Sequence, residues 1–134
     1  MTKFIIAYGT TAAVFFALDF LWLGVVAKDF YRSALGSLLL ERPNMTAAVV
    51  FYLLYVAGIV LFAVAPALAT ESWQKAVVLG ALFGFFAYST YDMTNLATLK
   101  GWPLSVVVVD IAWGALLTGI SAALGYALTT WIMR

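Results

Sequence analysis

The sequence contains no cysteine and no histidine among its 134 residues. Thiolate and imidazole groups form the usual soft-metal sites, and they carry much of the nucleophilic and general-base chemistry of enzymes. Both kinds of site are therefore excluded. Any acid–base chemistry in this chain must use carboxylates, tyrosines or lysines.

Charge is also scarce, since only 10% of the residues are charged and the net charge is +1. No basic excess points to a nucleic acid partner. Hydrophobic residues make up 66% of the chain, which is more apolar material than a soluble domain of this size can bury. The composition therefore predicts a membrane protein.

The charged residues stand in short clusters that divide the chain into four apolar blocks. A helix rises about 1.5 Å per residue, so blocks of twenty-odd residues are long enough to cross a hydrocarbon layer. The connections after the second and third blocks are short, which makes successive helices antiparallel neighbours. We predict an all-α, polytopic membrane protein: one domain over residues 1–134, a four-helix antiparallel bundle. Its predicted spans are residues 4–27, 46–69, 74–99 and 103–132.

The longest connection, KDFYRSALGSLLLERPN, covers residues 28–44. Its apolar residues, such as Tyr31 and Leu35, recur at helical spacing between charges. This pattern predicts a short interfacial helix at the membrane surface that ends at Pro43. The alternative is an extension of the first spanning helix.

Basic residues are almost evenly divided between the two ends of the predicted bundle. We call the end that holds the N-terminus side A and the opposite end side B. The small excess on side B slightly favours that side as cytoplasmic, but so small a bias also permits insertion in both orientations. Side A holds Lys3, Lys75 and Arg134, and side B holds Lys28, Arg32, Arg42 and Lys100.

Three aspartates, Asp19, Asp92 and Asp110, lie inside predicted spans. An aspartate at the centre of a membrane helix costs about 2.5–3.5 kcal/mol on the insertion scale, so three of them require burial and a partner or a function. Counted along the helices, each lies about 10–12 Å from side B. Because the chain reverses direction at each loop, we predict one polar chamber beneath side B.

The second and third helices add hydroxyl and amide groups at the same depth. Tyr52 and Tyr55 lie one turn apart on the second helix. On the third helix, Tyr88, Asp92 and Asn95 follow one another at spacings of four and three residues, which places them on one face. We therefore expect these side chains to line the chamber.

Two similar segments, DFLWLG and DIAWG, each place a tryptophan three residues after an aspartate. An inverted repeat would put the second copy near side A, whereas this one falls near side B, so we interpret the match as local similarity. Trp22 is predicted to be an interfacial anchor. Trp113 lies deeper and is predicted to form a wall or floor of the chamber.

Small residues indicate which helix faces meet. The third helix contains GALFG, with Gly80 and Gly84 one turn apart, and the fourth carries a stripe of small and polar residues from Asp110 to Gly125. We predict that these two faces pack together within one chain. The alternative use of the glycine pair is a dimer interface.

Five segments of the chain stand out: ALDFLWLG, FYRSALG, FYLLYVAGIVLF, YDMTNLATLKGWP and VVDIAWG. Together they resemble an uncharacterised bacterial family, domain of unknown function 2177. The resemblance covers almost the whole chain, and its most specific part is YDMTNLATLKGWP. It implies a small, multi-pass protein of the bacterial inner membrane and assigns no reaction.

The first functional hypothesis is a membrane-embedded site that binds or acts on an amphipathic, lipid-like substrate entering from side B. Asp92 and Asp110 are the candidate proton donor and acceptor, Asp19 is the third acid, and Asn95 and Tyr88 orient them. No cofactor is expected, although a divalent cation could be held by the three aspartates and Asn95, because hard cations prefer oxygen ligands. Further candidate binding residues are Trp22, Tyr52, Tyr55 and Trp113, together with Lys28, Arg32 and Lys100 for an anionic head group.

Two other hypotheses remain open. The chain could be a proton-coupled transporter or channel for a small solute, working as a homodimer because four helices alone enclose little space. It could also be an accessory membrane protein whose polar layer only sets the helix register.

Overall fold

The computed structural model describes all 134 residues, and it contains helices and no strands. Four helical spans are long and apolar enough to cross a membrane: Thr2–Val26, Met45–Ala69, Trp73–Thr98 and Leu104–Ile132. Each boundary lies within two residues of the predicted one. The predicted all-α, polytopic fold is confirmed.

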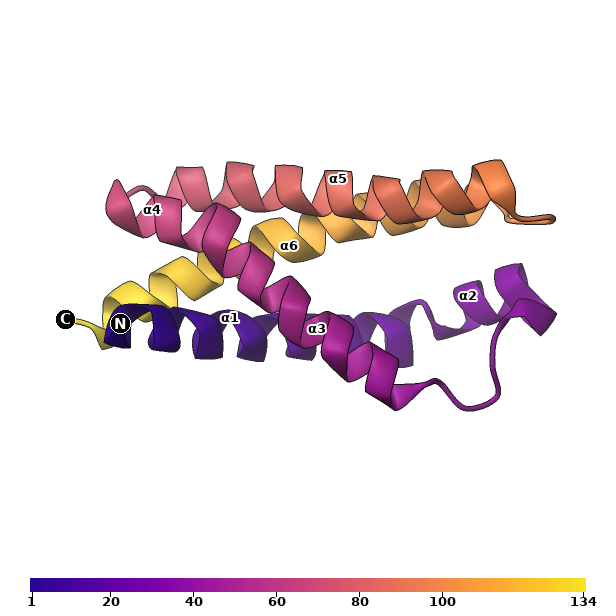
Figure 1. Cartoon of the computed structure of the whole chain (residues 1–134), viewed down its shortest axis with the longest axis horizontal. Helices are drawn as coiled ribbons and strands as arrows, with labels where there is room; N and C mark the ends of the chain where they lie inside the picture. The colour runs from indigo at the N-terminus through magenta and orange to yellow at the C-terminus, as the bar shows by residue number, and fades with distance from the viewer.

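Successive spans run in opposite directions, and both chain termini lie at the same end of the molecule (Figure 1). The first two spans each contain a stretch of π-helix, a wider turn that commonly marks functional or strained positions. The elements are α1 (Thr2–Leu21) with the π-helix Trp22–Val26, α3 (Met45–Ile59) with the π-helix Val60–Val64 and α4 (Ala65–Ala69), α5 (Trp73–Thr98) and α6 (Leu104–Ile132).

The connection after the first span forms a separate short helix, α2 (Lys28–Leu35), beyond the end of α1 (Figure 1). The backbone leaves helical geometry at Ala27, with φ −110° and ψ 9°, so the alternative of a longer first helix is wrong. The predicted end at Pro43 is also wrong. The helix ends at Leu35 because Gly36 adopts a φ of +52°, which glycine tolerates best, and a short 3₁₀ turn follows.

The faces predicted to meet do meet, and α5 and α6 form the most extensive helix pair. A methyl group added at Gly80 would lie 2.8 Å from the carbonyl oxygen of Thr118, and one added at Gly84 would overlap the backbone of Gly114. Both glycines are therefore used for packing within one chain, not for a dimer interface. The far end of the stripe on α6 contacts a different helix, because Gly125 packs against Thr11 of α1.

Gly84→Ala is expected to lower the free energy of unfolding by about 1–3 kcal/mol, because the added methyl group forces α5 and α6 apart. The measurement is equilibrium unfolding in mixed detergent. Gly9→Ala is the matched control, since nothing lies within 4 Å of a methyl group at that position of α1. Equal stability of the two variants would show that the close approach of α5 and α6 is not needed.

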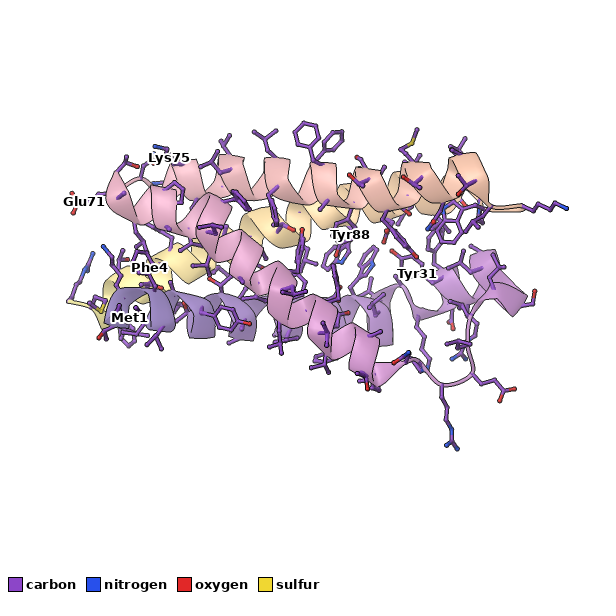
Figure 2. All side chains as sticks on the ribbon, viewed as in Figure 1. Met1, Phe4, Tyr31, Glu71, Lys75 and Tyr88 are labelled. Atoms are coloured by element: carbon purple, nitrogen blue, oxygen red, sulfur yellow. The ribbon has the colours of Figure 1, made fainter.

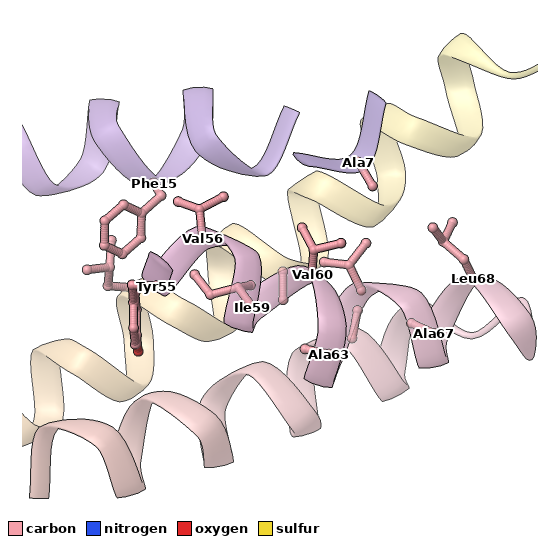
Figure 3. Close-up of a cluster of buried hydrophobic side chains, with 13 residues drawn as sticks. Ala7, Phe15, Tyr55, Val56, Ile59, Val60, Ala63, Ala67 and Leu68 are labelled. Atoms are coloured by element: carbon pink, nitrogen blue, oxygen red, sulfur yellow. The ribbon is translucent and has the colours of Figure 1, made fainter. Parts of the chain in front are cut away.

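The side A half of the bundle is filled by apolar side chains, shown in Figure 3. Phe15, Val56, Ile59 and Leu117 are fully buried in this core. Large apolar side chains also cover much of the outer surface, as expected where the surroundings are lipid. The space between the chamber level and side A is therefore mainly apolar, with four hydroxyl-bearing residues buried in it as well: Thr11, Thr118, Ser121 and Thr129.

Helix α3 runs diagonally across the bundle (Figure 1). The main contacts of the second span with α5 come from its π-helix, Val60–Val64, whereas α3 itself packs chiefly against α1. The first half of α3 therefore diverges from α5 toward side B. This divergence makes room for the cavity described below.

Candidate functional site

Asp92 is fully buried on α5, and neither of its carboxyl oxygens accepts a hydrogen bond from a donor in the chain. The carboxyl group of Asp92 lies next to that of Asp110 on α6. Two adjacent carboxylates without a counter-ion repel each other strongly in a low-dielectric medium. The two carboxyl groups therefore form a pair that no basic side chain compensates.

Asp110 is half-buried and accepts a hydrogen bond from the hydroxyl of Tyr31, at 2.7 Å. The indole N–H of Trp22 in turn donates to that hydroxyl, at 3.2 Å. Burial raises the pKa of Tyr31 above its ordinary value, so this hydroxyl stays neutral and can donate to the carboxylate. Helix α2 thus contributes a side chain to the layer that holds Asp19, Asp92 and Asp110, which we call the acidic layer.

Tyr31 was not among the candidate site residues, because its position on α2 suggested only an apolar contact. A signal was present in the sequence. Tyr31 is the hydroxyl-bearing residue on an otherwise apolar helix face, directly after a span that carries a buried aspartate. Figure 2 shows Tyr31 and Tyr88 on the inside of the bundle, between the helices.

Asp19 forms a second, separate polar centre. Its carboxyl oxygens accept hydrogen bonds from the hydroxyl of Tyr52, at 2.6 Å, and from the indole N–H of Trp113, at 3.3 Å. Asp19 is only 5% exposed. All the donors to Asp19 and Asp110 are neutral, and neither Lys28 nor Lys100 reaches them.

The two Asp-x-x-Trp segments pair with each other. The rings of Trp22 and Trp113 are stacked, with centroids 4.3 Å apart and an angle of 10° between their planes. Because α1 and α6 are antiparallel, the tryptophan of each segment reaches the aspartate of the other: Trp113 directly, and Trp22 through Tyr31. Trp22, predicted to be an interfacial anchor, thus also packs within the bundle, and Trp113, predicted to line the chamber, contacts both Trp22 and Asp19.

Three predicted chamber residues remain, and none of them makes a hydrogen bond to an aspartate. Tyr55 shares a hydrogen bond with Thr118, at 2.8 Å, and belongs to the core rather than to the acidic layer. The ring of Tyr88 lies directly over Gly114, where any side chain would overlap it. Asn95 is half-buried and makes no hydrogen bond to the three aspartates.

A cavity of about 370 Å³ lies beside the carboxyl pair, between α3 and α5. Two of its lining side chains, Phe51 and Tyr91, are 50% and 56% exposed and form its rim. The cavity therefore opens sideways, between two spanning helices, toward the lipid-facing surface. It is lined by Phe51, Ala87, Tyr88, Tyr91 and Asp110.

The basic residues predicted to hold an anionic head group lie outside this cavity. Lys28, Arg32 and Lys100 are all exposed, and none of them lines it. The acids also do not gather into a group with the spacing of metal ligands. The geometry therefore does not support a cation held jointly by Asp19, Asp92, Asp110 and Asn95.

Tyr31→Phe is expected to loosen α2, because it removes the hydrogen bond to Asp110 and leaves Trp22 without an acceptor. The expected loss of stability is about 0.5–2 kcal/mol. Hydrogen–deuterium exchange in lipid nanodiscs should show faster exchange across residues 28–44. Tyr126→Phe is the control, since its hydroxyl lines a pocket near side A and makes no hydrogen bond within the chain. Unchanged exchange in Tyr31→Phe would contradict the docking role.

The fold and the acidic layer define a class: a small helical membrane protein with a carboxyl pair buried between two spanning helices. The chain belongs to the family described as predicted membrane proteins of domain of unknown function 2177, whose sequence profile matches residues 4–127. No curated protein and no solved structure matches the chain.

Proposed function

We propose that this protein binds an amphipathic, lipid-like molecule in the cavity between α3 and α5, with the polar end of the molecule at the Asp92–Asp110 pair. One observation carries the proposal. Asp92 is fully buried without a hydrogen-bond donor, directly behind the acid that lines an open cavity. Such a group is expensive inside a membrane, and a structural role would supply it with donors, as Asp19 is supplied.

The entry route follows from the packing of α3. A molecule dissolved in the bilayer reaches the cavity between Phe51 and Tyr91 without passing through water. Its hydrocarbon part stays between α3 and α5, where exposed apolar side chains already face lipid. Its polar part meets Asp110, and Asp92 lies behind Asp110 as the second carboxyl group.

The pair is suited to general acid–base work on the bound polar group. Asp110 touches the ligand and exchanges a proton with it, while Asp92 stores the proton or accepts it from Asp110. Asp19 already accepts hydrogen bonds from Tyr52 and Trp113. Its role is therefore to hold Trp113, which is stacked on Trp22, in position. We place the protein in the bacterial inner membrane, with Lys28, Arg32 and Lys100 in contact with anionic lipid head groups.

Transport is the second candidate function. A transporter needs a route from its site to both membrane faces. Between the acidic layer and side A, however, large apolar side chains such as Phe15, Ile59 and Leu117 are fully buried, and the polar groups buried among them are hydroxyls and not carboxylates. This packing favours a binding site open to the bilayer over a path across it. Proton or solute flux in liposomes that is lost in Asp92→Asn would reverse this preference.

The test is recovery of the bound molecule. The protein is purified in mild detergent or native nanodiscs, and its lipid-like contents are identified by mass spectrometry. We expect a specific molecule to be retained by the wild type and by Asp29→Asn, which changes an exposed aspartate on α2, and to be lost from Asp110→Asn. The same contents in all three proteins would contradict a site at Asp110.

A further inference from the structure

The cavity combines aromatic rings with a carboxyl group. Phe51, Tyr88 and Tyr91 supply three rings, and Asp110 supplies the acid. The faces of aromatic rings carry partial negative charge and attract cations, most strongly where water is excluded. Every one of these groups is thus better suited to a positive charge than to a negative one.

No basic side chain balances the acids inside the bundle. The hydrogen bonds to Asp19 and Asp110 come from Tyr31, Tyr52 and Trp113, which are neutral donors. Asp92 adds a third acid, fully buried and without any donor, against Asp110. A carboxylate in a low-dielectric layer without a counter-ion is strongly destabilised, and a cationic ligand relieves that penalty.

An anionic head group has the opposite effect. Placed in the cavity, a phosphate or carboxylate would lie beside Asp110 and close to Asp92, and no basic residue lines the cavity to compensate. Lys28, Arg32 and Lys100 are exposed outside it. The expected phosphate-holding role of these three residues therefore does not extend to the cavity itself.

We propose that the ligand of the cavity is an amphipathic amine, a molecule with an ammonium group attached to a hydrocarbon tail. The ammonium group lies beside Asp110 and against the rings of Tyr88 and Tyr91, and the tail leaves past Phe51 between α3 and α5. This inference rests on the proposed function and names the ligand class of the same site.

The experiment compares three probes with the same tail and different head groups. Dodecyltrimethylammonium, dodecanol and dodecyl phosphate are titrated into nanodiscs that contain the protein, and binding is followed by calorimetry against empty nanodiscs. We expect the ammonium probe to bind about tenfold or more tightly than either of the others. Asp110→Asn should lower its affinity by a similar factor, whereas Asp29→Asn, on the exposed side of α2, should not.

Tyr91→Leu provides a second variant that does not depend on the acids. Tyr91 is 56% exposed at the rim, so its replacement by another apolar side chain leaves the core intact. We expect weaker binding of the ammonium probe and unchanged binding of dodecanol, because only the cation uses the ring face. Equal losses for both probes would contradict the ammonium–ring contact.

The outcomes separate this inference from the proposed function. Binding of all three probes with equal affinity, lost in Asp110→Asn, would overturn the amine class and leave the lipid-like site in place. Absence of binding by every probe, with no molecule recovered from the purified protein, would overturn both. Equal binding of the ammonium probe to wild type and Asp110→Asn would show simple adsorption and overturn the inference.

Discussion

Asp92→Leu is expected to make the protein more stable while abolishing its binding of ligand. Asp92 is fully buried and has no donor in the chain, so its carboxyl group loses hydration on folding and gains only the neighbouring Asp110. Replacement of a poorly compensated buried polar group by an apolar one of similar size stabilises proteins by about 1–4 kcal/mol. Asp110 keeps its hydrogen bond from Tyr31.

The measurement pairs two readouts on one variant: equilibrium unfolding in mixed detergent, and binding of the dodecyl probes in nanodiscs. A gain in stability together with loss of binding is the signature of a functional acid. A loss of several kcal/mol, with binding preserved, would instead assign Asp92 to the framework of the bundle. It would then favour the hypothesis that the acids only set the helix register.

Asp19→Leu is expected to have the opposite effect on stability. Its removal leaves the hydroxyl of Tyr52 and the indole N–H of Trp113 without acceptors. Each unsatisfied buried donor costs about 1–3 kcal/mol. Loss of the hydrogen bond to Asp19 also frees Trp113, whose ring is stacked on Trp22. The stacked pair of tryptophans should therefore loosen.

Tryptophan fluorescence checks whether the Trp22–Trp113 pair loosens, because the stacked pair should give a distinct emission that changes when the rings separate. Asp19→Asn is the conservative variant: it keeps one acceptor oxygen, and its stability should fall between wild type and Asp19→Leu. Stability of Asp19→Leu equal to wild type would show that the hydrogen bonds to Asp19 contribute nothing to the fold.

Much of the architecture could be predicted because membrane insertion depends on local composition. The apolar blocks and the charges between them locate four spans to within two residues. The rise of a helix and the reversal of the chain at each loop place Asp19, Asp92 and Asp110 at one depth. The glycine spacing on α5 predicts its contact with α6, and the structure confirms it.

The pairing of the polar groups could not be predicted, because depth along a helix does not specify which neighbour a side chain faces. Tyr55 lies at the right depth, yet it turns to Thr118 in the core. Trp22 has the position of an interfacial anchor, yet it stacks on Trp113. The role of Tyr31 could not be predicted because the break at Ala27 lets α2 pack against α6, a contact between residues 79 positions apart.

The sequence by itself determined that this protein resides in a membrane, how many times it crosses, and that three acids share one layer. These properties follow from hydrophobicity and helix geometry, which act residue by residue. Only the tertiary structure decided that Asp19 is satisfied while Asp92 is not, and that α3 diverges from α5 to leave a cavity beside Asp110. The physical reason is that hydrogen bonding and helix tilt depend on the packing of all four spans together.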